Sequence, residues 1–394
     1  MTYTLKNKDT NVLTFDVVAK EDTVFGTKEY NYTVENIHVE NVAMLPKTIK
    51  QDDLQETLTH WIKKRKVPKN REFSEKLVWT YRHATTEALM DYVDVSLALS
   101  LNDTYWVVPH STDNSYTWDK YNLYENSFDE ALTAVAFDGL SLKVSAITSS
   151  PEYTTNGMLK KCWHKEEDKI YLYKASSRPY ANGGKEAFSE YYMAQIAQTM
   201  GFNAIAYDLK MFHNTLVSSC ELFTSQKEGY LPIYYCLNEE ARKTQRLELL
   251  SEIAKIYTNN AFTDLMVFDA MIYNQDRHLG NFGMLIDNDT GKLLKPAPIF
   301  DNGLSMINFL TQDELKTMKE TLSQKEGYFG YGFDEQMRIF IEERHIASLE
   351  KLLTFEFKKH SDFNLSDEWL EATQKHIQER AKMAIHMVEE KKKY

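Results

Sequence analysis

The spacing of hydrophobic and polar residues predicts strands at the start of the chain and helices after them. Residues 1–40 alternate polar residues with apolar and β-branched ones, as in NVLTFDVVAK and YNYTVENIHV, which predicts short strands in a sheet. In IKQDDLQETLTHWIKKRKVP, four apolar residues share one helical face: Leu54, Leu58, Trp61 and Ile62. Acids come first in this segment, lysines come last and Pro68 interrupts the pattern, so we predict an amphipathic helix. TTEALMDYVDVSLALS predicts a second helix.

Between residues 140 and 237 the pattern changes to a small sheet followed by one helix. LSLKVSAI, GMLKKCWH and KIYLYKAS resemble strands and are separated by polar turns, which predicts an antiparallel sheet. GGKEAFSEYYMAQIAQTMGF then places Phe188, Ile196 and Met200 on one helical face. Gly201 follows and favours the end of a helix.

Residues 238–394 are predicted to be mainly helical. Apolar residues recur at helical spacing from Leu247 to Tyr257 and again from Leu265 to Ile272. A last helix is expected to begin after Ser366, a residue type that caps helix amino termini, and to run into KKKY. The chain is therefore predicted to have three parts, which span residues 1–139, 140–237 and 238–394.

Composition narrows the class of protein. The 394 residues are 43% hydrophobic and include 24 tyrosines, 20 phenylalanines and 6 tryptophans, which is typical of an ordered globular protein. A net charge of -12 argues against broad binding to nucleic acid or anionic membranes. The three cysteines are too few for a disulfide framework, and the start MTYTLKNKDT lacks a signal-peptide pattern. We expect a cytoplasmic protein that contacts neither a membrane nor nucleic acid directly.

A cluster of polar residues interrupts the helical region between two apolar runs. In DRHLGN, Asp276 and Asn281 are five residues apart, and PIFDNG later brings Asp301 close to Gly303. Phosphoryl transfer uses a carboxylate that accepts the proton of the attacking hydroxyl and hard oxygen ligands that hold Mg²⁺. An aspartate, an amide five residues later and a second aspartate before glycine supply these groups, so the pattern indicates phosphoryl transfer.

Residues that would hold nucleotide phosphates lie upstream. Lys174 ends a predicted strand, and Glu190 lies sixteen residues later in the predicted helix. A strand lysine paired with a helix glutamate holds the α and β phosphates of ATP in protein kinases. Backbone N–H groups and hydroxyls of the loop SSPEYTTNG are further candidates for binding phosphate. Four of its residues are assigned to this role: Thr154, Thr155, Asn156 and Gly157.

Together these segments resemble the HipA-like serine/threonine kinases, a bacterial family related in catalytic architecture to the phosphoinositide kinases. The matching pieces are YLYK, the Glu190 helix, CELF, NQDRHLGNFG and IFDNGLS, and LSLNDTYWV and FDE extend the likeness to the amino-terminal part. The resemblance implies an α+β, two-lobed protein-kinase-like fold of the HipA type with an additional amino-terminal α+β region. Residues 140–237 would then be the amino-terminal kinase lobe, and residues 238–394 the carboxy-terminal lobe.

The resemblance also implies roles for individual residues. Asp276 would be the catalytic base, Asn281 and Asp301 the Mg²⁺ ligands, and Lys174 with Glu190 the phosphate clamp. CELF would be the nucleotide hinge, with Glu221 and Phe223 contacting the cofactor. The cofactors implied are ATP and Mg²⁺.

The implied function is phosphorylation of a serine or threonine on a protein, including autophosphorylation, as a component of a toxin–antitoxin or defence system. The family often acts with a small DNA-binding antitoxin, so any contact with DNA would come through that partner. Two other functions remain open for the same fold. One is a small-molecule or lipid kinase or an AMP transferase, and the other is a nucleotide-binding pseudokinase that acts as a scaffold.

Simpler interpretations exist for several of these residues. Asp276 and Asn281 belong to residue types that are common at helix ends and turns. Arg277 and His278 are expected to brace the loop rather than to transfer protons. CELF would also suit an ordinary buried strand, and Glu186, one turn before Glu190, is the alternative partner for the lysine. The combination of positions therefore supports phosphoryl transfer more strongly than any single residue does.

Overall fold

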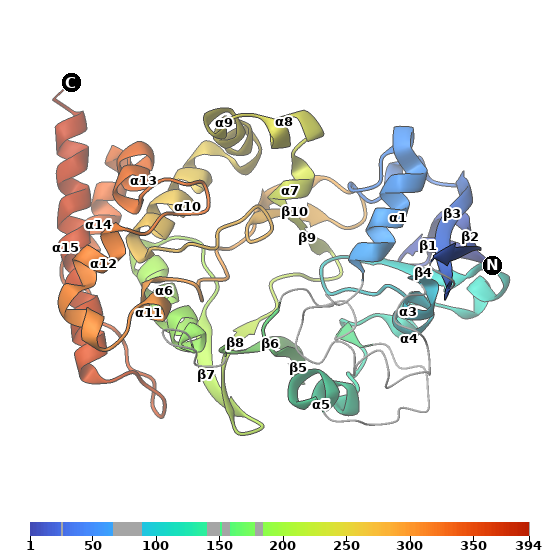
Figure 1. The fold of residues 1–394 in the computed structure, drawn as a ribbon, viewed down its shortest axis with the longest axis horizontal. Coiled ribbons are helices and arrows are strands. Elements are labelled where there is room, and N and C mark those ends of the chain that lie inside the picture. Colours follow the sequence, from blue (N-terminus) through green and yellow to red (C-terminus); the bar gives the residue numbers. More distant parts are fainter. Residues whose placement is uncertain (25–26, 66–88, 140–149, 152–157, 178–183, 394) are drawn as a thin grey trace. The chain divides into compact units, whose positions relative to one another are not determined.

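A computed structural model describes residues 1–24, 27–65, 89–139, 150–151, 158–177 and 184–393 (Figure 1). The chain forms two compact units. The first contains Met1–Leu172, Thr224–Leu231 and Leu285–Leu294, and the second contains Tyr173–Phe223, Pro232–Met284 and Lys295–Tyr394. The strand predicted at residues 140–147 lies outside the described residues. The predicted division into residues 1–139, 140–237 and 238–394 stays a prediction. It describes lobes of a kinase fold, whereas the two units are defined by the compactness of the chain.

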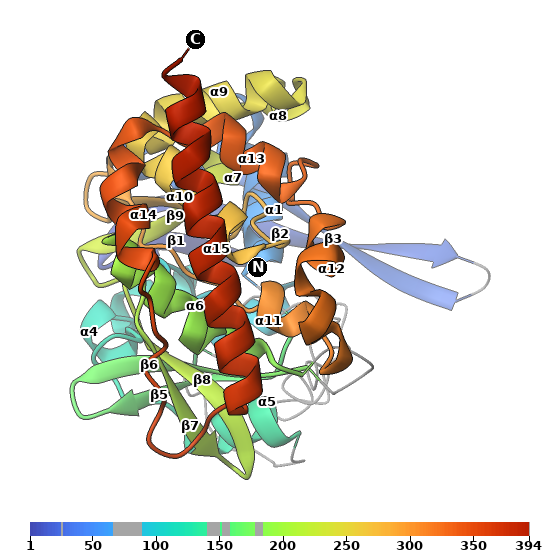
Figure 2. The same cartoon turned by 90° about the vertical axis from the view of Figure 1, so that its left-hand side faces the viewer.

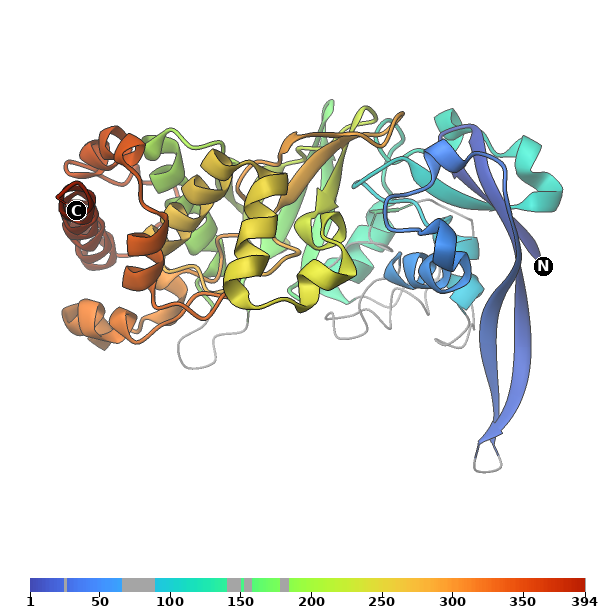
Figure 3. The ribbon, with the colours of Figure 1, turned by 90° about the horizontal axis from the view of Figure 1, so that it is seen from above.

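The first unit is built around a four-stranded sheet with the order β3-β2-β1-β4. Its strands are β1 (Thr2–Asn7), β2 (Thr10–Val24), β3 (Thr27–Val39) and β4 (Tyr105–Pro109). β1 pairs antiparallel with β2 only as far as Asp16, whereas β2 and β3 remain paired to Val24 and Thr27. Figure 3 shows this longer β2–β3 hairpin extending beyond the other strands of its sheet. The strands predicted within residues 1–40 are confirmed, but β2 and β3 are longer than the short strands expected.

Short helices complete the first unit. They are α1 (Leu54–Lys64), α3 (Leu89–Ser96), α4 (Trp118–Tyr121) and α5 (Glu130–Asp138). Leu58, Trp61 and Ile62 of α1 are buried and belong to the same apolar cluster as residues of the sheet. The amphipathic helix predicted here is confirmed, and so is the helix predicted after residue 85, in its described part.

Two further sheets contribute strands near the predicted site. The first has the order β5-β6-β8-β7, and its strands are β5 (Lys161–Glu166), β6 (Lys169–Ala175), β7 (Tyr207–Phe212) and β8 (Thr215–Glu221). The chain passes into the second unit within β6, at Tyr173, so the end of β6 belongs with β7 and β8. The other sheet has the order β11-β10-β9 and consists of β9 (Glu228–Pro232), β10 (Gly283–Asp287) and β11 (Leu293–Pro296).

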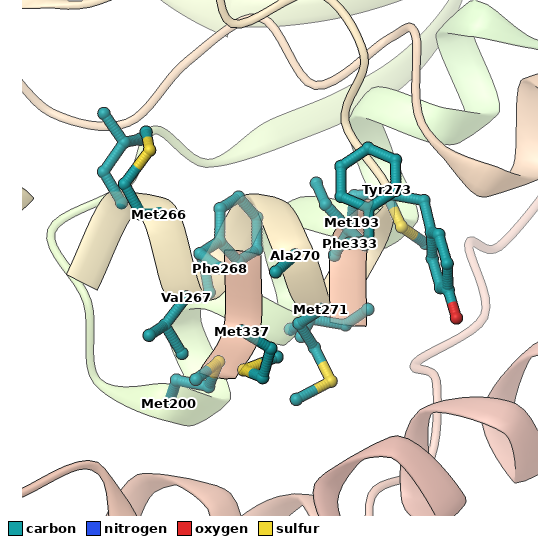
Figure 4. Packing of buried hydrophobic residues seen from close by; sticks show 14 of the residues in the cluster. Met193, Met200, Met266, Val267, Phe268, Ala270, Met271, Tyr273, Phe333 and Met337 are labelled. Atoms are coloured by element: carbon teal, nitrogen blue, oxygen red, sulfur yellow. The ribbon is translucent and has the colours of Figure 1, made fainter. Parts of the chain in front are cut away.

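The second unit is mainly helical. Its helices are α6 (Glu186–Met200), α7 (Ile233–Cys236), α8 (Glu239–Lys243), α9 (Arg246–Tyr257), α10 (Asn259–Ile272), α11 (Met306–Phe309), α12 (Met318–Ser323), α13 (Phe333–Phe340), α14 (Ile346–Leu352) and α15 (Asp367–Lys391). Every residue of α10 from Leu265 to Ile272 is buried. Figure 4 shows its side chains packed with methionines of α6 and α13, and Figure 2 shows α15 along the outer side of this unit.

The helix ends follow local signals. Gly201 adopts φ 79° directly after α6, a left-handed conformation that glycine reaches without a steric penalty. The Ser366 side chain accepts a hydrogen bond from the Trp369 N–H and caps α15 as predicted. The helix predicted from the spacing of Leu247 to Tyr257 is confirmed as α9, in which Leu247 is 68% exposed. No helix in the described part of the chain combines the length and the apolar character needed to cross a membrane.

Candidate active site

Lys174 joins two of the predicted site carboxylates. It lies near the end of β6, and its Nζ donates a hydrogen bond to Oε1 of Glu190 on α6 at 2.9 Å. The same ammonium group contacts Oδ1 of Asp301. The Lys174 side chain is only 13% exposed and that of Glu190 only 1%, so these charges meet largely away from water. Glu186, the alternative partner, instead accepts a hydrogen bond from the Ser177 hydroxyl at 2.5 Å.

The charges of this cluster depend on one another. Burial by itself lowers the pKa of Lys174, but the nearby carboxylates of Asp301 and Glu190 outweigh this effect, and the net result is a raised pKa. Burial raises the pKa of Glu190, and the ammonium group of Lys174 opposes that rise. Lys174 is therefore cationic at neutral pH, which its predicted role in a phosphate clamp requires.

The predicted catalytic loop follows the buried helix α10. Asp276 stands four residues after the end of this helix, and the Asn281 Nδ2 donates to its backbone carbonyl at 2.8 Å and to its Oδ2 at 3.3 Å. Burial, and next the negative charge of Asp301, raise the pKa of the Asp276 carboxyl. Because the nitrogen of Asn281 is engaged by Asp276, its Oδ1 is the atom that could ligate a cation.

Asp301 adopts a backbone conformation that a non-glycine residue rarely takes. Its φ is 58°, in the left-handed region. Two hydrogen bonds hold it there: the Asp301 N–H donates to the Tyr207 hydroxyl at 3.1 Å, and the Asn274 Nδ2 donates to the Asp301 carbonyl at 3.4 Å. Such strain persists only where the surroundings over-determine it, and it is concentrated at functional sites.

The residues after Asp301 fit closely against the buried glutamate. The Asn302 N–H donates to Oε2 of Glu190 at 2.7 Å. A Cβ atom at Gly303 would lie 3.3 Å from Oε1 of Glu190, so glycine permits the closest approach here. Glu190 thus holds both the lysine and the segment that carries Asp301, which couples α6 to the predicted metal ligand.

Arg277 connects the catalytic loop to the segment around Asp301. Its side chain is 2% exposed, and its Nε donates to Oδ2 of Asp269 in α10 at 2.9 Å. The guanidinium also donates to the carbonyls of Asn281 and Phe300 and, at 2.9 Å, to Oδ1 of Asn302. Burying a guanidinium is costly unless a carboxylate and good hydrogen bonds surround it, and all of these are present. Arg277 therefore braces the loop.

The helix α15 contacts the residue that directly follows α10, just before the same loop. Tyr273, directly after α10, has φ 59°, and its hydroxyl accepts a hydrogen bond from Arg380. The Arg380 guanidinium also stacks 4.2 Å from the centre of the Tyr273 ring and pairs with Asp334 at 2.7 Å. His376 lies 3.1 Å from the same hydroxyl, and burial lowers the pKa of His376 to about 4. The histidine is therefore neutral at pH 7.

The remaining predicted cofactor residues are four in the phosphate loop and two in the nucleotide hinge. Thr154, Thr155, Asn156 and Gly157 lie outside the described residues. Glu221 ends β8 and is exposed, whereas Phe223 is half-buried, with its ring 5.5 Å from that of Phe300. Phe223 therefore reaches the residue before Asp301. Cys220 directly precedes Glu221. Burial raises the pKa of its thiol to about 12, so the thiol is protonated at neutral pH.

Sequence patterns did not single out three residues that complete the site: Asp269, Tyr207 and Arg380. Asp269 had a visible signal, because it is the one acidic residue in the apolar run LMVFDAMI, where an unpaired charge would be very unfavourable. Tyr207 and Arg380 had none, since they act across 94 and 107 residues of chain.

Comparison with known proteins supports the same fold. No protein-family model matches the chain. The chain is 27% identical over 155 residues to the serine/threonine-protein kinase CtkA of Helicobacter pylori, a match that spans 34% of this chain and 46% of that relative. A crystal structure of a proinflammatory kinase CtkA of Helicobacter pylori aligns with a TM-score of 0.47 at 15% identity, over 60% of this chain and 93% of CtkA.

A second solved structure covers almost the whole chain. HipA of Shewanella oneidensis, in a complex with HipB and operator DNA, aligns over 98% of both chains with a TM-score of 0.52 at 12% identity. At this identity the likeness concerns the fold alone. The predicted α+β kinase-like fold is therefore confirmed, and so is the resemblance to HipA-like kinases.

Proposed function

Because the chain has the α+β fold of HipA-like kinases, we propose that it is an ATP- and Mg²⁺-dependent kinase that phosphorylates serine or threonine residues of a protein. The contact of Lys174 with both Glu190 and Asp301 carries this proposal. A lysine that pairs with a helix glutamate, beside an aspartate that can hold a metal ion, is the arrangement that positions the phosphates of ATP. Similarity in sequence to the kinase CtkA over part of the chain supports it.

We assign to Asp276 the role of binding the acceptor hydroxyl. Its carboxylate is half-buried and lies beside Asn281, so it can accept a hydrogen bond from a serine or threonine hydroxyl and take its proton. The raised pKa of Asp276 makes it a stronger base than an ordinary aspartate. Arg277 and Asn274 keep the loop in place.

The residues present fit Mg²⁺ with ATP. Asn281 Oδ1 and the carboxylate of Asp301 are hard oxygen donors, the kind that Mg²⁺ prefers. Among the described residues, no three His, Cys, Asp or Glu side chains converge to hold a metal. Two protein ligands suffice when phosphate oxygens and water complete an octahedral shell, which is how Mg²⁺ is usually bound at nucleotide sites. When bound, the ion would neutralise charge on the phosphates.

Single substitutions test the proposed chemistry. Purified protein would be incubated with γ-labelled ATP, Mg²⁺ and a mixed serine/threonine peptide library. Asp276→Ala and Asp301→Ala should each lower phosphate transfer by at least about a hundredfold, since general-base and metal contributions are of that order or larger. Asp313→Ala, which changes an exposed aspartate, is the matched control and should retain activity. Full activity in both site variants would refute the proposal.

The two competing chemistries are separated by the position of the label. An AMP transferase would leave an α label on the product, whereas a kinase leaves only a γ label. A small-molecule or lipid kinase would transfer the γ label to no peptide or protein. A pseudokinase would bind ATP without any transfer.

A small DNA-binding protein is the partner that we propose. The support is the fold shared with HipA, whose structure was determined with HipB and operator DNA. Coexpression with the product of the adjacent reading frame, followed by size-exclusion chromatography with light scattering, tests this. Elution of two separate proteins at micromolar concentration would count against it.

A further inference from the structure

Two exposed tyrosines belong to segments that contact the predicted catalytic loop. Tyr328, which is 49% exposed, has its ring in edge contact with His278, two residues after Asp276. Tyr234, which is 40% exposed, donates its backbone N–H to the Leu279 carbonyl at 3.1 Å. Because His278 and Leu279 are consecutive, both tyrosines belong to segments that contact the stretch of chain just after Asp276.

Each of these neighbourhoods also contains an arginine stacked on an aromatic ring. The Arg242 guanidinium of α8 lies 4.5 Å from the centre of the Tyr234 ring. The Arg246 guanidinium of α9 lies 4.6 Å from the centre of the Tyr331 ring, and its Nη1 donates to the Gly330 carbonyl at 3.0 Å. Arg246 therefore anchors the loop that carries Tyr328. Gly330 has φ 70°, and a Cβ atom there would lie 2.6 Å from Arg246 Nη2.

Neither arginine has a carboxylate partner among the described residues. In the described part of the chain, the side chain of Arg242 donates to the backbone carbonyl of Asn238, and that of Arg246 donates to the backbone carbonyl of Gly330. By contrast Lys243, next to Arg242 in sequence, pairs with Glu239 at 3.1 Å. Two unpaired guanidinium groups beside the catalytic loop are notable in a chain whose net charge is -12.

Stacking prepares these arginines to bind an anion. A guanidinium lying flat on a ring has its motion restricted, while the N–H groups along its edge still point outward as donors. An arginine held in this way loses less conformational entropy when it binds a carboxylate, and its planar fork matches the two carboxylate oxygens.

We propose that Arg242, Arg246, Tyr234 and Tyr328 form the docking surface for the phosphoacceptor segment of a protein substrate, and that the surface selects acidic residues near the acceptor serine or threonine. This inference rests on the proposed kinase function and names its substrate class. The two tyrosines offer flat apolar contacts to the extended peptide, and the two arginines supply the charge that recognises aspartate or glutamate.

The test compares substrate preference between charge variants. Full-length protein with γ-labelled ATP and Mg²⁺ would phosphorylate a library in which the positions around a fixed serine or threonine vary. The wild type should favour acidic residues. Arg242→Glu with Arg246→Glu should lower kcat/KM for acidic peptides by about tenfold and shift the preference towards basic ones, because reversing exposed charges replaces attraction with repulsion.

The matched control reverses a lysine on the same helix as Arg246. Lys255 lies nine residues away on α9 and pairs with Glu252 at 2.6 Å. Lys255→Glu should leave the preference unchanged. The KM for ATP should be the same in all variants, because none of these residues belongs to the predicted nucleotide site.

The outcomes separate this inference from the proposed function. Transfer to peptides without an acidic preference, or with a preference that the double variant retains, overturns the docking surface alone. Transfer to no peptide overturns the proposed function, and the docking surface with it. A loss of preference in the Lys255→Glu control as large as in the double variant also overturns the docking surface, because the effect would then be one of overall charge.

Discussion

The buried pair of Asp269 and Arg277 offers a way to separate the stability of the fold from the assembly of the site. The two side chains are 1% and 2% exposed, and two N–H groups of the arginine donate to the carboxylate at 2.9 and 3.0 Å. Removing one partner leaves an uncompensated charge in the interior, which costs about 3–5 kcal/mol. We therefore expect Asp269→Ala to lower the free energy of unfolding of the second unit by that amount.

Replacing both residues should restore most of the lost stability. Asp269→Leu combined with Arg277→Met removes both charges and keeps an apolar volume, and such exchanges are often neutral for stability. The double variant should therefore lie within about 1–2 kcal/mol of the wild type. Phosphate transfer should still be lost, because the hydrogen bonds from Arg277 to the Asn281 and Phe300 carbonyls position the two predicted metal ligands.

The measurement must follow the second unit alone. Trp369, buried in α15, is the one tryptophan in its residue range, so its resonance in protein labelled with 5-fluorotryptophan reports on that unit during a urea titration. Glu252→Ala, which breaks the exposed pair with Lys255, is the control and should cost no more than about 0.5 kcal/mol. The reasoning is refuted if the double variant is destabilised as much as Asp269→Ala, or if the double variant keeps full activity.

Three further predictions concern Asp276, Tyr273 and Ser366. Because burial raises the pKa of Asp276, activity should rise with pH through a midpoint above that of an ordinary aspartate. The stability of the wild type relative to Asp276→Asn should be greatest at low pH and decline as pH rises through the folded-state pKa. A midpoint at or below about 3.9 in pH–rate profiles would contradict the activity prediction. Tyr273→Phe removes the hydroxyl that Arg380 and His376 contact, and should lower kcat and cost about 1–2 kcal/mol without changing the KM for ATP; unchanged kcat and urea midpoint would argue against support of the loop by α15. Ser366→Ala should speed hydrogen exchange in the first turn of α15 and cost about 1 kcal/mol, whereas Ser366→Asn should not; equal exchange in both variants would remove the assigned cap.

Several elements could be predicted closely because their signals are local. The amphipathic pattern around Trp61, the helix stop at Gly201 and the cap at Ser366 each depend on a few neighbouring residues. Leu247 shares the helical spacing of α9, but the structure leaves its side chain exposed. Periodicity identifies the residues that share a face, but the packing of other elements decides how much of that face is covered.

In the candidate site, too, some features follow from the sequence and others only from the folded structure. Asp276, Asn281 and Asp301 could be proposed from the sequence because phosphoryl transfer requires particular oxygen groups and their spacing along the chain is short. The choice of Glu190 over Glu186 needed the structure, since both lie on α6 one turn apart. Their different partners depend on where β6 ends against the helix.

The chain's own pattern of residues thus determined the helices and strands, their capping and the set of polar groups capable of phosphoryl transfer, because these depend on periods and spacings of a few residues. Tertiary structure alone decided which buried polar groups meet: Asp269 with Arg277, Tyr207 with Asp301, and Arg380 with Tyr273. A buried polar group must find a partner in the folded state, but its identity depends on packing between distant segments. The local periodicity of the sequence therefore cannot predict these partners.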